Sequence, residues 1–532
     1  MIQNHLLLVL SLLFTISMLT ILSSKLKVSY PIFLVIAGLI ISLIPGLPEI
    51  HIEPDFVFLI FLPPLLYAAA WNTSWNDFWK YRRPISLLGF GLVIFTSATV
   101  AVVAHWLIPG FPLAYGFLLG GIISPPDAVA ASSVLRGLKI PKRVNVILEG
   151  ESLVNDAASI IVFRFALAAI LTQQFNFWRA TETFFLVAIA GVVIGLVIGY
   201  IIYGIHHYFP TTPAIDTSIT LISPYVMYIV AEHFHVSGVL AVVTGGLFLG
   251  FRSQDYFGYE SRLQAEGLWE TLIFLLNGFV FILIGLQLPA IAQGMDGYSI
   301  GTATGYAILI SLLIIAIRLL WVYPAAYIPR MLFKSVREKE PRPSERGVFL
   351  IGWAGMRGIV SLAAALSIPL MLNEGTPFPH RNLILFISFV VILITLVLQG
   401  LSLKTVIRIL KVEVNEEELQ RINGLAMRVQ MAEAVLSYLD TNYADEISSN
   451  ETYKRVRDRY ERMIELSKKR IRGEEHEDDV NSFLPHYRQM LVELVKIRRL
   501  LIRQFRYKNE FEEELIRERE RELDLEEARL ST

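Results

Sequence analysis

The segment GGIISPPDAVAASSV (Gly120–Val134) interrupts an apolar run with two adjacent prolines and a carboxylate. The next apolar run, ILEGESLVNDAASIIVFRFAL (Ile147–Leu167), carries acidic, amide and guanidinium side chains. Charged groups inside a membrane-spanning segment are costly and usually face a functional interior. We therefore expect these two segments to fold as spanning helices that share the functional site.

The composition around these segments is typical of a polytopic membrane protein. Of the 532 residues, 54% are hydrophobic and 18% are charged, and the mean hydropathy is +0.53. The charge is uneven, because 51 of the 122 residues after Leu410 are charged against 44 of the first 410. We expect a membrane domain over residues 1–410 and a charged, helical, regulatory cytoplasmic tail over residues 411–532. The absence of cysteine excludes disulfides and thiolate metal sites, and the balanced charge gives no support for nucleic-acid binding.

Apolar runs bounded by glycine, proline or charge predict an all-α protein with thirteen transmembrane helices. The predicted limits are 4–23, 30–46, 55–71, 84–108, 113–137, 146–172, 180–205, 213–233, 235–251, 266–288, 301–328, 346–371 and 382–402. The first run lacks a basic start and a small-residue cleavage site, so we expect a retained helix rather than a signal peptide.

The loop charges predict the orientation of these helices. If the N-terminus is outside, the five inner loops hold seventeen Lys and Arg, and the outer loops hold only Arg179 and Arg381. This asymmetry follows the positive-inside rule. We therefore expect a multi-pass protein of the cell membrane with its N-terminus outside and its charged tail in the cytoplasm.

The fifth predicted helix contains Pro125, Pro126 and Asp127 near its middle. Proline has no N–H to donate, so the carbonyl groups one turn earlier, around Gly121 and Ile122, should lose their helical partners. Free carbonyl groups at membrane depth persist only when they are buried or line a wet cavity. A carboxylate beside them gives a site suited to a hard cation, although an Asp there can also cap the second half of the helix.

The sixth predicted helix supplies partner groups for Asp127. On an α-helix Glu151, Ser152, Asn155 and Asp156 fall within an arc of about 140°. Ser152 and Asp156, four residues apart, share one face, and Asp156 lies at a depth similar to that of Asp127. Glu149 lies nearer the cytoplasmic end and is interpreted as an entrance or structural acid.

This pair of helices suggests competition between a cation and a proton. When no cation is bound, two carboxylates in a poorly hydrated site should share at least one proton. Asn155 can hydrogen-bond but cannot titrate, which limits the proton count and predicts exchange of one proton for one monovalent cation. Such a device needs no cofactor and is not an enzyme; a hydrolase based on Ser152 lacks a His or Lys base nearby. The alternative is a gated cation channel, or a sensor that acts through the tail.

The twelfth predicted helix is a second place where a spanning helix should break. Three glycines surround Arg357 in GWAGMRGIVSLAAALSIP (Gly352–Pro369). It comes seven predicted helices after the fifth, and this odd offset means that the two should run in opposite directions, as in inverted repeats with two discontinuous crossing helices. Arg357 would balance half-helix carbonyl ends and acidic charge there, or form a plain ion pair. Arg318 is a further charge-balancing group, and it and Asn277 either join helices or contact the substrate.

Four motifs make the chain resemble the bacterial monovalent cation/proton antiporters of the sodium/proton exchanger type, and the resemblance covers roughly residues 5–405. These motifs are FLPPLLY (Phe61–Tyr67), SPPDAVA (Ser124–Ala130), EGESLVNDA (Glu149–Ala157) and GMRGIVSLA (Gly355–Ala363). The resemblance implies antiport of Na⁺, with Li⁺ and K⁺ as alternatives, by a homodimer in membrane lipid. It also implies a mobile core over about 84–172 and 301–402, moving against a dimerisation domain.

The resemblance also implies roles for individual residues. Asp127 would be the main cation and proton carrier, and Glu151, Ser152 and Asp156 would help to ligate the cation. Asn155 would orient the site, and the Asn-Asp pair is similar to that of the electroneutral branch. The family's usual Thr-Asp-Pro reads Pro126-Asp127-Ala128 here, so the backbone carbonyl of Pro126 survives as a ligand but the hydroxyl is lost.

Overall fold

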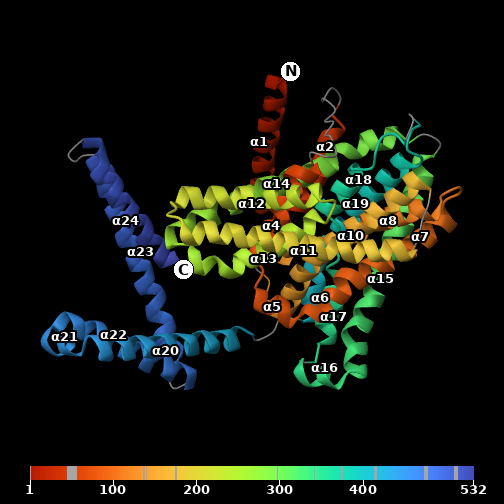
Figure 1. Ribbon diagram of the computed structural model, residues 1–532. Coiled ribbons are helices and arrows are strands. Elements are labelled where there is room, and N and C mark those ends of the chain that lie inside the picture. The colour runs from red at the N-terminus through yellow and green to blue at the C-terminus, as the bar shows by residue number, and fades with distance from the viewer. Residues whose placement is uncertain are drawn as a thin grey trace. The chain divides into compact units, whose positions relative to one another are not determined.

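The computed structural model describes residues 2–44, 57–135, 138, 140–173, 177–295, 298–340, 342–372, 376–411, 416–472, 477–508 and 513–531. The chain divides into two compact units, Met1–Val414 and Asn415–Thr532. The described residues are helical or irregular and contain no strand beyond a single bridge between Met371 and Pro377. The chain is therefore all-α (Figure 1).

The first unit holds the helices predicted for the membrane. They are α1 (Ile2–Leu26), α2 (Tyr30–Ser42), the π-helix η1 (Val57–Phe61), α4 (Leu62–Asn72), α5 (Trp75–Lys80), α6 (Arg82–Ser86), the π-helix η2 (Leu87–Leu92), α7 (Val93–Leu107), α8 (Leu113–Ile123), α9 (Ala128–Leu135), α10 (Lys142–Thr172), α11 (Phe177–Tyr208), α12 (Pro213–His233), α13 (Gly238–Tyr256), α14 (Tyr259–Gln293), α15 (Ile300–Leu332), α16 (Lys334–Lys339), α17 (Glu345–Trp353), α18 (Ile359–Leu366) and α19 (Arg381–Leu410). Every predicted transmembrane run coincides with one or more of these helices.

Nine helical stretches among the described residues are long and apolar enough to cross a membrane. They are Leu7–Leu26, Arg82–Leu107, Leu113–Leu135, Lys142–Thr172, Glu182–Tyr208, Pro213–His233, Tyr259–Pro289, Ile300–Leu332 and Arg381–Leu410. Two shorter apolar stretches are Tyr30–Ser42 and Leu59–Asn72. These lengths and compositions support a polytopic membrane protein.

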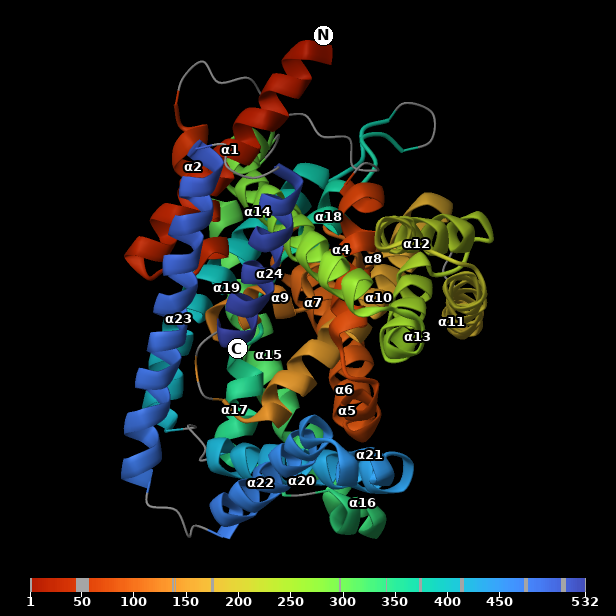
Figure 2. The same cartoon turned by 90° about the vertical axis from the view of Figure 1, so that its left-hand side faces the viewer.

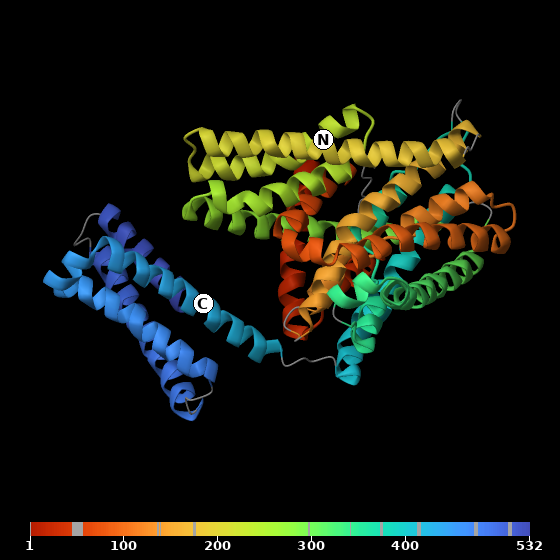
Figure 3. The same cartoon turned by 60° about the horizontal axis from the view of Figure 1, so that its bottom comes forward.

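The helices of the first unit form two groups that pack mainly within themselves. In one group α13 packs against α4, α11 and α12, and α14 packs against α1, α2 and α12. In the other, α8 packs against α7 and α10, and α15 and α18 pack against α19. Figures 1 and 3 show α11 to α14 side by side in yellow and green, with α7, α8 and α10 beside α15 and α19.

Two of the predicted transmembrane runs in the second group are broken in the middle. The α8–α9 break spans the four residues Ser124–Asp127, because Pro125 and Pro126 cannot donate the hydrogen bonds that would continue α8. The α17–α18 break lies between Trp353 and Ile359 and contains Gly355 and Gly358. Glycine is a poor helix former, so the chain leaves the helix there at little cost.

The described residues of the second unit form five helices, four of which pack in two pairs. They are α20 (Glu416–Asn442), α21 (Ala444–Ser449), α22 (Glu451–Arg472), α23 (Glu477–Lys508) and α24 (Glu513–Ser531). Figure 2 shows α20 beside α22 and α23 beside α24. Arg499 on α23 pairs with Asp524 (2.5 Å) and Glu527 (2.6 Å) on α24. Such exposed ion pairs contribute little stability each, which agrees with a solvated, charged unit.

Candidate cation site

The two helix breaks are in direct contact. The main-chain N–H of Asp127, in the first break, donates to the carbonyl of Met356 in the second (2.6 Å). In return the guanidinium of Arg357 donates to the carbonyl of Ile123, the last residue of α8 (Nε···O 3.0 Å). Segments about 230 residues apart in the sequence therefore supply each other's missing hydrogen bonds.

A buried arginine binds the carboxyl end of each half-helix that precedes a break. Arg357 contacts the carbonyl groups at the end of α8 and also donates to that of Gly355. Arg318, on α15, donates to the carbonyl of Ile351 in the last turn of α17 (Nη2···O 3.0 Å). Both arginines are 1% exposed. A positive charge is favourable at this end of a helix dipole, so the arginines stabilise the interrupted helices.

Pro125 and Pro126 remove the main-chain donors that a continuous helix would offer to the carbonyl groups of Gly121 and Ile122. The Ser124 N–H reaches the carbonyl of Gly120 (3.0 Å) and its hydroxyl reaches that of Gly121 (3.3 Å), so α8 keeps its last turn. The groups left for Arg357 are those of Ile123 and Ser124. The break also frees the carbonyl groups of Ile123 and Ser124, because the N–H groups of Asp127 and Ala128 donate to Met356 and Ser152 instead.

A cavity of about 260 Å³ lies beside the first break. It is lined by acidic and polar residues and by an apolar wall from α4: Asp127, Ser132, Glu149, Ser152, Asp156, Asn277 and Ser361, with Pro125, Pro126, Gly358, Leu62, Leu65 and Leu66 among the others. Asp127, Ser152, Asp156 and Pro126, which are four of the predicted ligands, therefore share one space.

Asp127 both caps a helix and lines this cavity. Its Oδ1 accepts from the main-chain N–H groups of Val129 (2.7 Å) and Ala130 (3.4 Å) at the start of α9. The hydroxyl oxygen of Ser152 accepts from the N–H of Ala128 (3.3 Å). These donors hold the carboxylate and the hydroxyl at the amino end of α9, where negative charge is favoured. The capping and ligand interpretations of Asp127 are therefore compatible.

Asn155 and Asp156 are adjacent but have different surroundings. The Asn155 amide donates to the carbonyl of Pro126 (Nδ2···O 3.1 Å), which ties α10 to the first break. Its buried Oδ1 has no hydrogen-bond partner among the described residues. Asp156, 7% exposed, reaches the cavity instead. A carbonyl oxygen has a second lone pair, so Pro126 can still face a cation.

Glu151 occupies a different position from the one predicted. Its carboxylate receives two hydrogen bonds from Arg318 (2.5 and 2.9 Å), and each side chain is 1% exposed. Glu151 is absent from the residues found to line the cavity. The structure therefore favours a positioning role for Glu151 over direct ligation, and the partner of Arg318 is this carboxylate.

Two lining residues were missed or undervalued by sequence reasoning. Asn277 on α14 was interpreted as either a helix contact or a substrate contact, and Ser361 on α18 was not singled out. Both are 1% exposed and both line the cavity. Ser361 follows the Gly355–Gly358 segment by one helical turn, which is the signal that could have identified it. Arg164, conversely, pairs with Glu232 on α12 (2.8 Å) away from the cavity.

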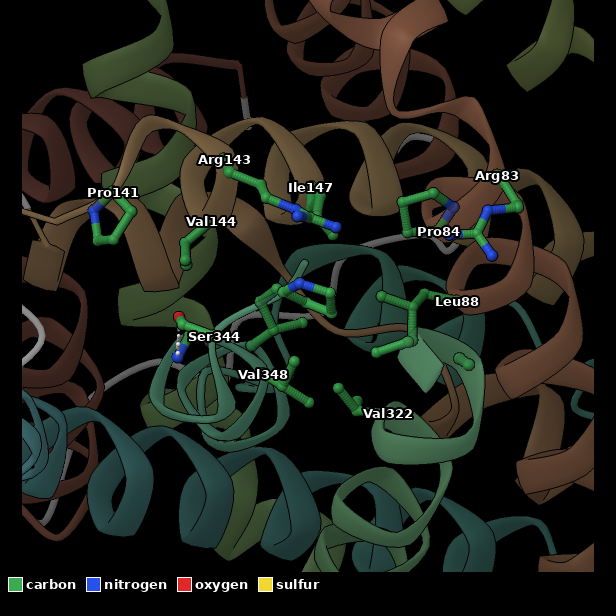
Figure 4. Close-up of a pocket in the computed structure, with 15 residues that line it drawn as sticks. Arg83, Pro84, Leu88, Pro141, Arg143, Val144, Ile147, Val322, Ser344 and Val348 are labelled. Carbon is green, nitrogen blue, oxygen red and sulfur yellow. Dashed lines mark hydrogen bonds between the residues drawn. The ribbon is translucent and has the colours of Figure 1, made fainter. Parts of the chain in front are cut away.

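A second, smaller cavity of about 70 Å³ has a different chemical character (Figure 4). Leu88, Val144 and Val348 give it an apolar wall, and Arg83 and Arg143 supply its charges. None of the described residues that line it carries a carboxylate. The larger cavity is therefore the one suited to attract a cation.

Comparison with known proteins identifies the family. Residues 9–409 match the profile described as "Sodium/hydrogen exchanger, transmembrane". The chain belongs to the sodium/hydrogen exchanger family. A sodium, potassium, lithium and rubidium/H⁺ antiporter of Bacillus pumilus is 33% identical over 382 residues, which are 70% of this chain and 57% of the relative. The chain thus spans little more than half the length of that relative.

Two other similarities agree with the family and the fold. An uncharacterized Na⁺/H⁺ exchanger of Mycobacterium bovis is 32% identical over 432 residues, covering 80% of this chain and 78% of the relative. The sodium proton antiporter MjNhaP1 of Methanocaldococcus jannaschii superposes with a TM-score of 0.59 at 17% identity, covering 76% of this chain and 98% of that one. At this identity the superposition establishes a shared membrane fold.

Proposed function

We propose that the protein is a secondary transporter that exchanges Na⁺ for H⁺ across the cell membrane, one for one. The observation that supports this most directly is the shared cavity, in which Asp127 and Asp156 face the same space as Ser152. Carboxylate, hydroxyl and carbonyl oxygens are the ligands that hard cations prefer. Family membership and the antiporter names of the relatives agree with this function.

Exchange follows from competition for these oxygens. With no cation bound, Asp127 and Asp156 lower their repulsion by sharing a proton. An entering Na⁺ replaces that proton, with Ser152 and the carbonyl of Pro126 completing its shell. One positive charge replaces another, and Asn155 adds no titrating group. The loaded and protonated sites therefore carry the same charge, which makes the exchange electroneutral.

The two helix groups suggest how the site alternates between the two sides of the membrane. We assign the α6–α10 and α15–α19 elements to a mobile core, and α1, α2, α4 and α11–α14 to a dimerisation domain. We propose thirteen spanning segments, with the two broken stretches crossing at mid-depth; the positive-inside rule then favours an N-terminus outside and the charged unit in the cytoplasm. In this arrangement Glu151 and Arg318 position the helices, and only the groups in the cavity touch the ion.

Everted membrane vesicles test the function. Adding Na⁺ to vesicles that were acidified by respiration should dequench a pH-sensitive dye. Asp127→Asn and Asp156→Asn should each abolish this signal at equal protein abundance. Glu232→Gln, which removes an exposed acid on α12, should leave it within about twofold. Near-normal signals from both Asp variants would contradict the site.

The same vesicles test the stoichiometry and the rival function. Electroneutral exchange should proceed at the same rate whether the membrane potential is clamped at zero or held at a large value. A rate that follows the potential would contradict one-for-one exchange. A cation current without proton movement would indicate a channel instead.

A further inference from the structure

The cavity has a second polar wall that the carboxylates do not form. Asn277 on α14 and Ser361 on α18 both line it and both are 1% exposed. The Asn277 Oδ1 and the Ser361 Oγ are buried and have no hydrogen-bond partner among the described residues. A buried oxygen without a donor is unfavourable, so these two oxygens favour a hydrogen-bond donor or a cation in the cavity that they line.

Other buried side chains also have polar atoms without a hydrogen-bond partner among the described residues. Gln399 and Ser388 on α19 are each 0% exposed and also have polar atoms without a partner among the described residues. Neither is among the residues found to line the cavity. Asn277 and Ser361 are thus distinguished by open space in front of them, space they share with Asp127 and Asp156. The α19 pair provides matched controls.

Asn277 comes from the other group of helices. Helix α14 packs chiefly against α2 and α12, and less extensively against α1 and α19. Asp127, just before α9, and Asp156 on α10 belong to the group of α8 and α10. The contact between α14 and α18 is limited in comparison. An amide oxygen on α14 therefore faces the carboxylates across the boundary between the two groups.

We propose that the Asn277 Oδ1 and the Ser361 Oγ form a second position for a partly hydrated monovalent cation in this cavity. At this position the ion is on its way from bulk water to the carboxylates. The inference rests on the proposed function. Amide and hydroxyl oxygens bind a cation but do not titrate in the working range, so this position selects for the cation without competing for the proton. It exists only while α14 faces the carboxylates.

The consequence for transport is an effect on the cation alone. Removing one oxygen that contacts a charged ligand should raise the apparent KM for Na⁺ about tenfold. The maximal rate should change by less than about threefold, because the carboxylates are intact. The pH dependence at saturating Na⁺ should be unchanged, because neither side chain carries the proton.

The test compares Asn277→Leu and Ser361→Ala with Gln399→Met and Ser388→Ala. Initial rates of exchange are measured in everted vesicles against Na⁺, Li⁺ and K⁺ at several pH values. The cavity variants should raise the cation KM and alter the ratio of the KM values for Na⁺ and K⁺, and the α19 variants should not. Equal KM values for the Asn277 and Gln399 variants would overturn the proposal.

Two further measurements separate the possible failures. Asn277→Asp keeps an oxygen of the same size, so it should retain a low cation KM while adding a new pH dependence. If Asn277→Leu is not inserted, the absence of any pH change in Asn277→Asp overturns the proposal on its own. If Asp127→Asn still exchanges, the proposed function fails; if Asp127→Asn is inactive and the Asn277 variants are normal, only the second position fails.

Discussion

Breaking the buried Glu151–Arg318 pair should strongly destabilise the membrane unit. Both side chains are 1% exposed, and they are joined by two hydrogen bonds of 2.5 and 2.9 Å. Glu151→Gln leaves the Arg318 charge buried without a carboxylate, and Arg318→Met leaves the Glu151 charge without a guanidinium. Removing one partner of a buried ion pair typically lowers the free energy of unfolding by roughly 3–5 kcal/mol.

The double variant, Glu151→Gln with Arg318→Met, should recover part of this loss. With both charges gone, neither position holds an unpaired ion. The double variant should therefore lose much less free energy of unfolding than the two single variants lose together. Exchanging the two residues, by contrast, should not restore stability. The carbonyl of Ile351 accepts from Arg318 (3.0 Å) and would face a carboxylate instead.

Unfolding in mixed micelles with increasing dodecyl sulfate measures these differences, followed by the fluorescence of the chain's eight tryptophans. The exposed Arg164–Glu232 pair is the control, with side chains 44% and 30% exposed. Neutralising it should change the free energy of unfolding by at most about 1 kcal/mol. Strict additivity of Glu151→Gln and Arg318→Met, or a loss no larger than that of the control, would refute a coupled buried pair.

Two further predictions test the first helix break and the α5–α10 contact. Gly358→Ala places a Cβ against the carboxylate of Asp127 and should reduce exchange on the order of 100-fold. Gly305→Ala is the control and should retain exchange, because a Cβ at that position has no other atom within 4 Å. Equal vesicle signals from the two variants would contradict the packing at Gly358. The hydrogen bond from Lys142 (2.7 Å) lowers the pKa of Asp77 below its ordinary 3.8, so the pair adds stability above about pH 4 and loses it as the pH falls through the folded-state pKa. The melting temperatures of the native chain and Lys142→Met should therefore differ at pH 7 and converge in acid, and a constant difference would contradict this.

The sequence predicted well those features that depend on local chemistry. Two prolines remove two donors, so the break after Ile123 follows from the residues at that position. Ser152 and Asp156 are four residues apart on α10, and helix periodicity alone places them on one face. The helical character of each apolar run follows from the same kind of reasoning, since an unpaired backbone is not tolerated in lipid.

Partners distant in the sequence could not be predicted in this way. Glu151 precedes Ser152 by one residue, which rotates it by about 100° toward whatever packs there. That neighbour is Arg318, 167 residues away, and no local pattern indicates it. Arg357 was expected to balance half-helix carbonyl ends and acidic charge; it reaches the carbonyl of Ile123 at the end of α8, but the sequence did not indicate which carbonyl group it would meet. Which guanidinium meets which acceptor depends on tertiary packing.

The hydrogen bonds between the two breaks bear on the energetics of transport. The Asp127 N–H is bonded to Met356 and Arg357 to Ile123, so hydrogen bonds join the two breaks in both directions. If the two joined breaks move as a whole, the oxygens that surround the ion keep the same arrangement on both sides of the membrane. The intrinsic dissociation constant is then equal on the two sides. The proposed exchanger would then show the same apparent Na⁺ affinity from either face of the membrane.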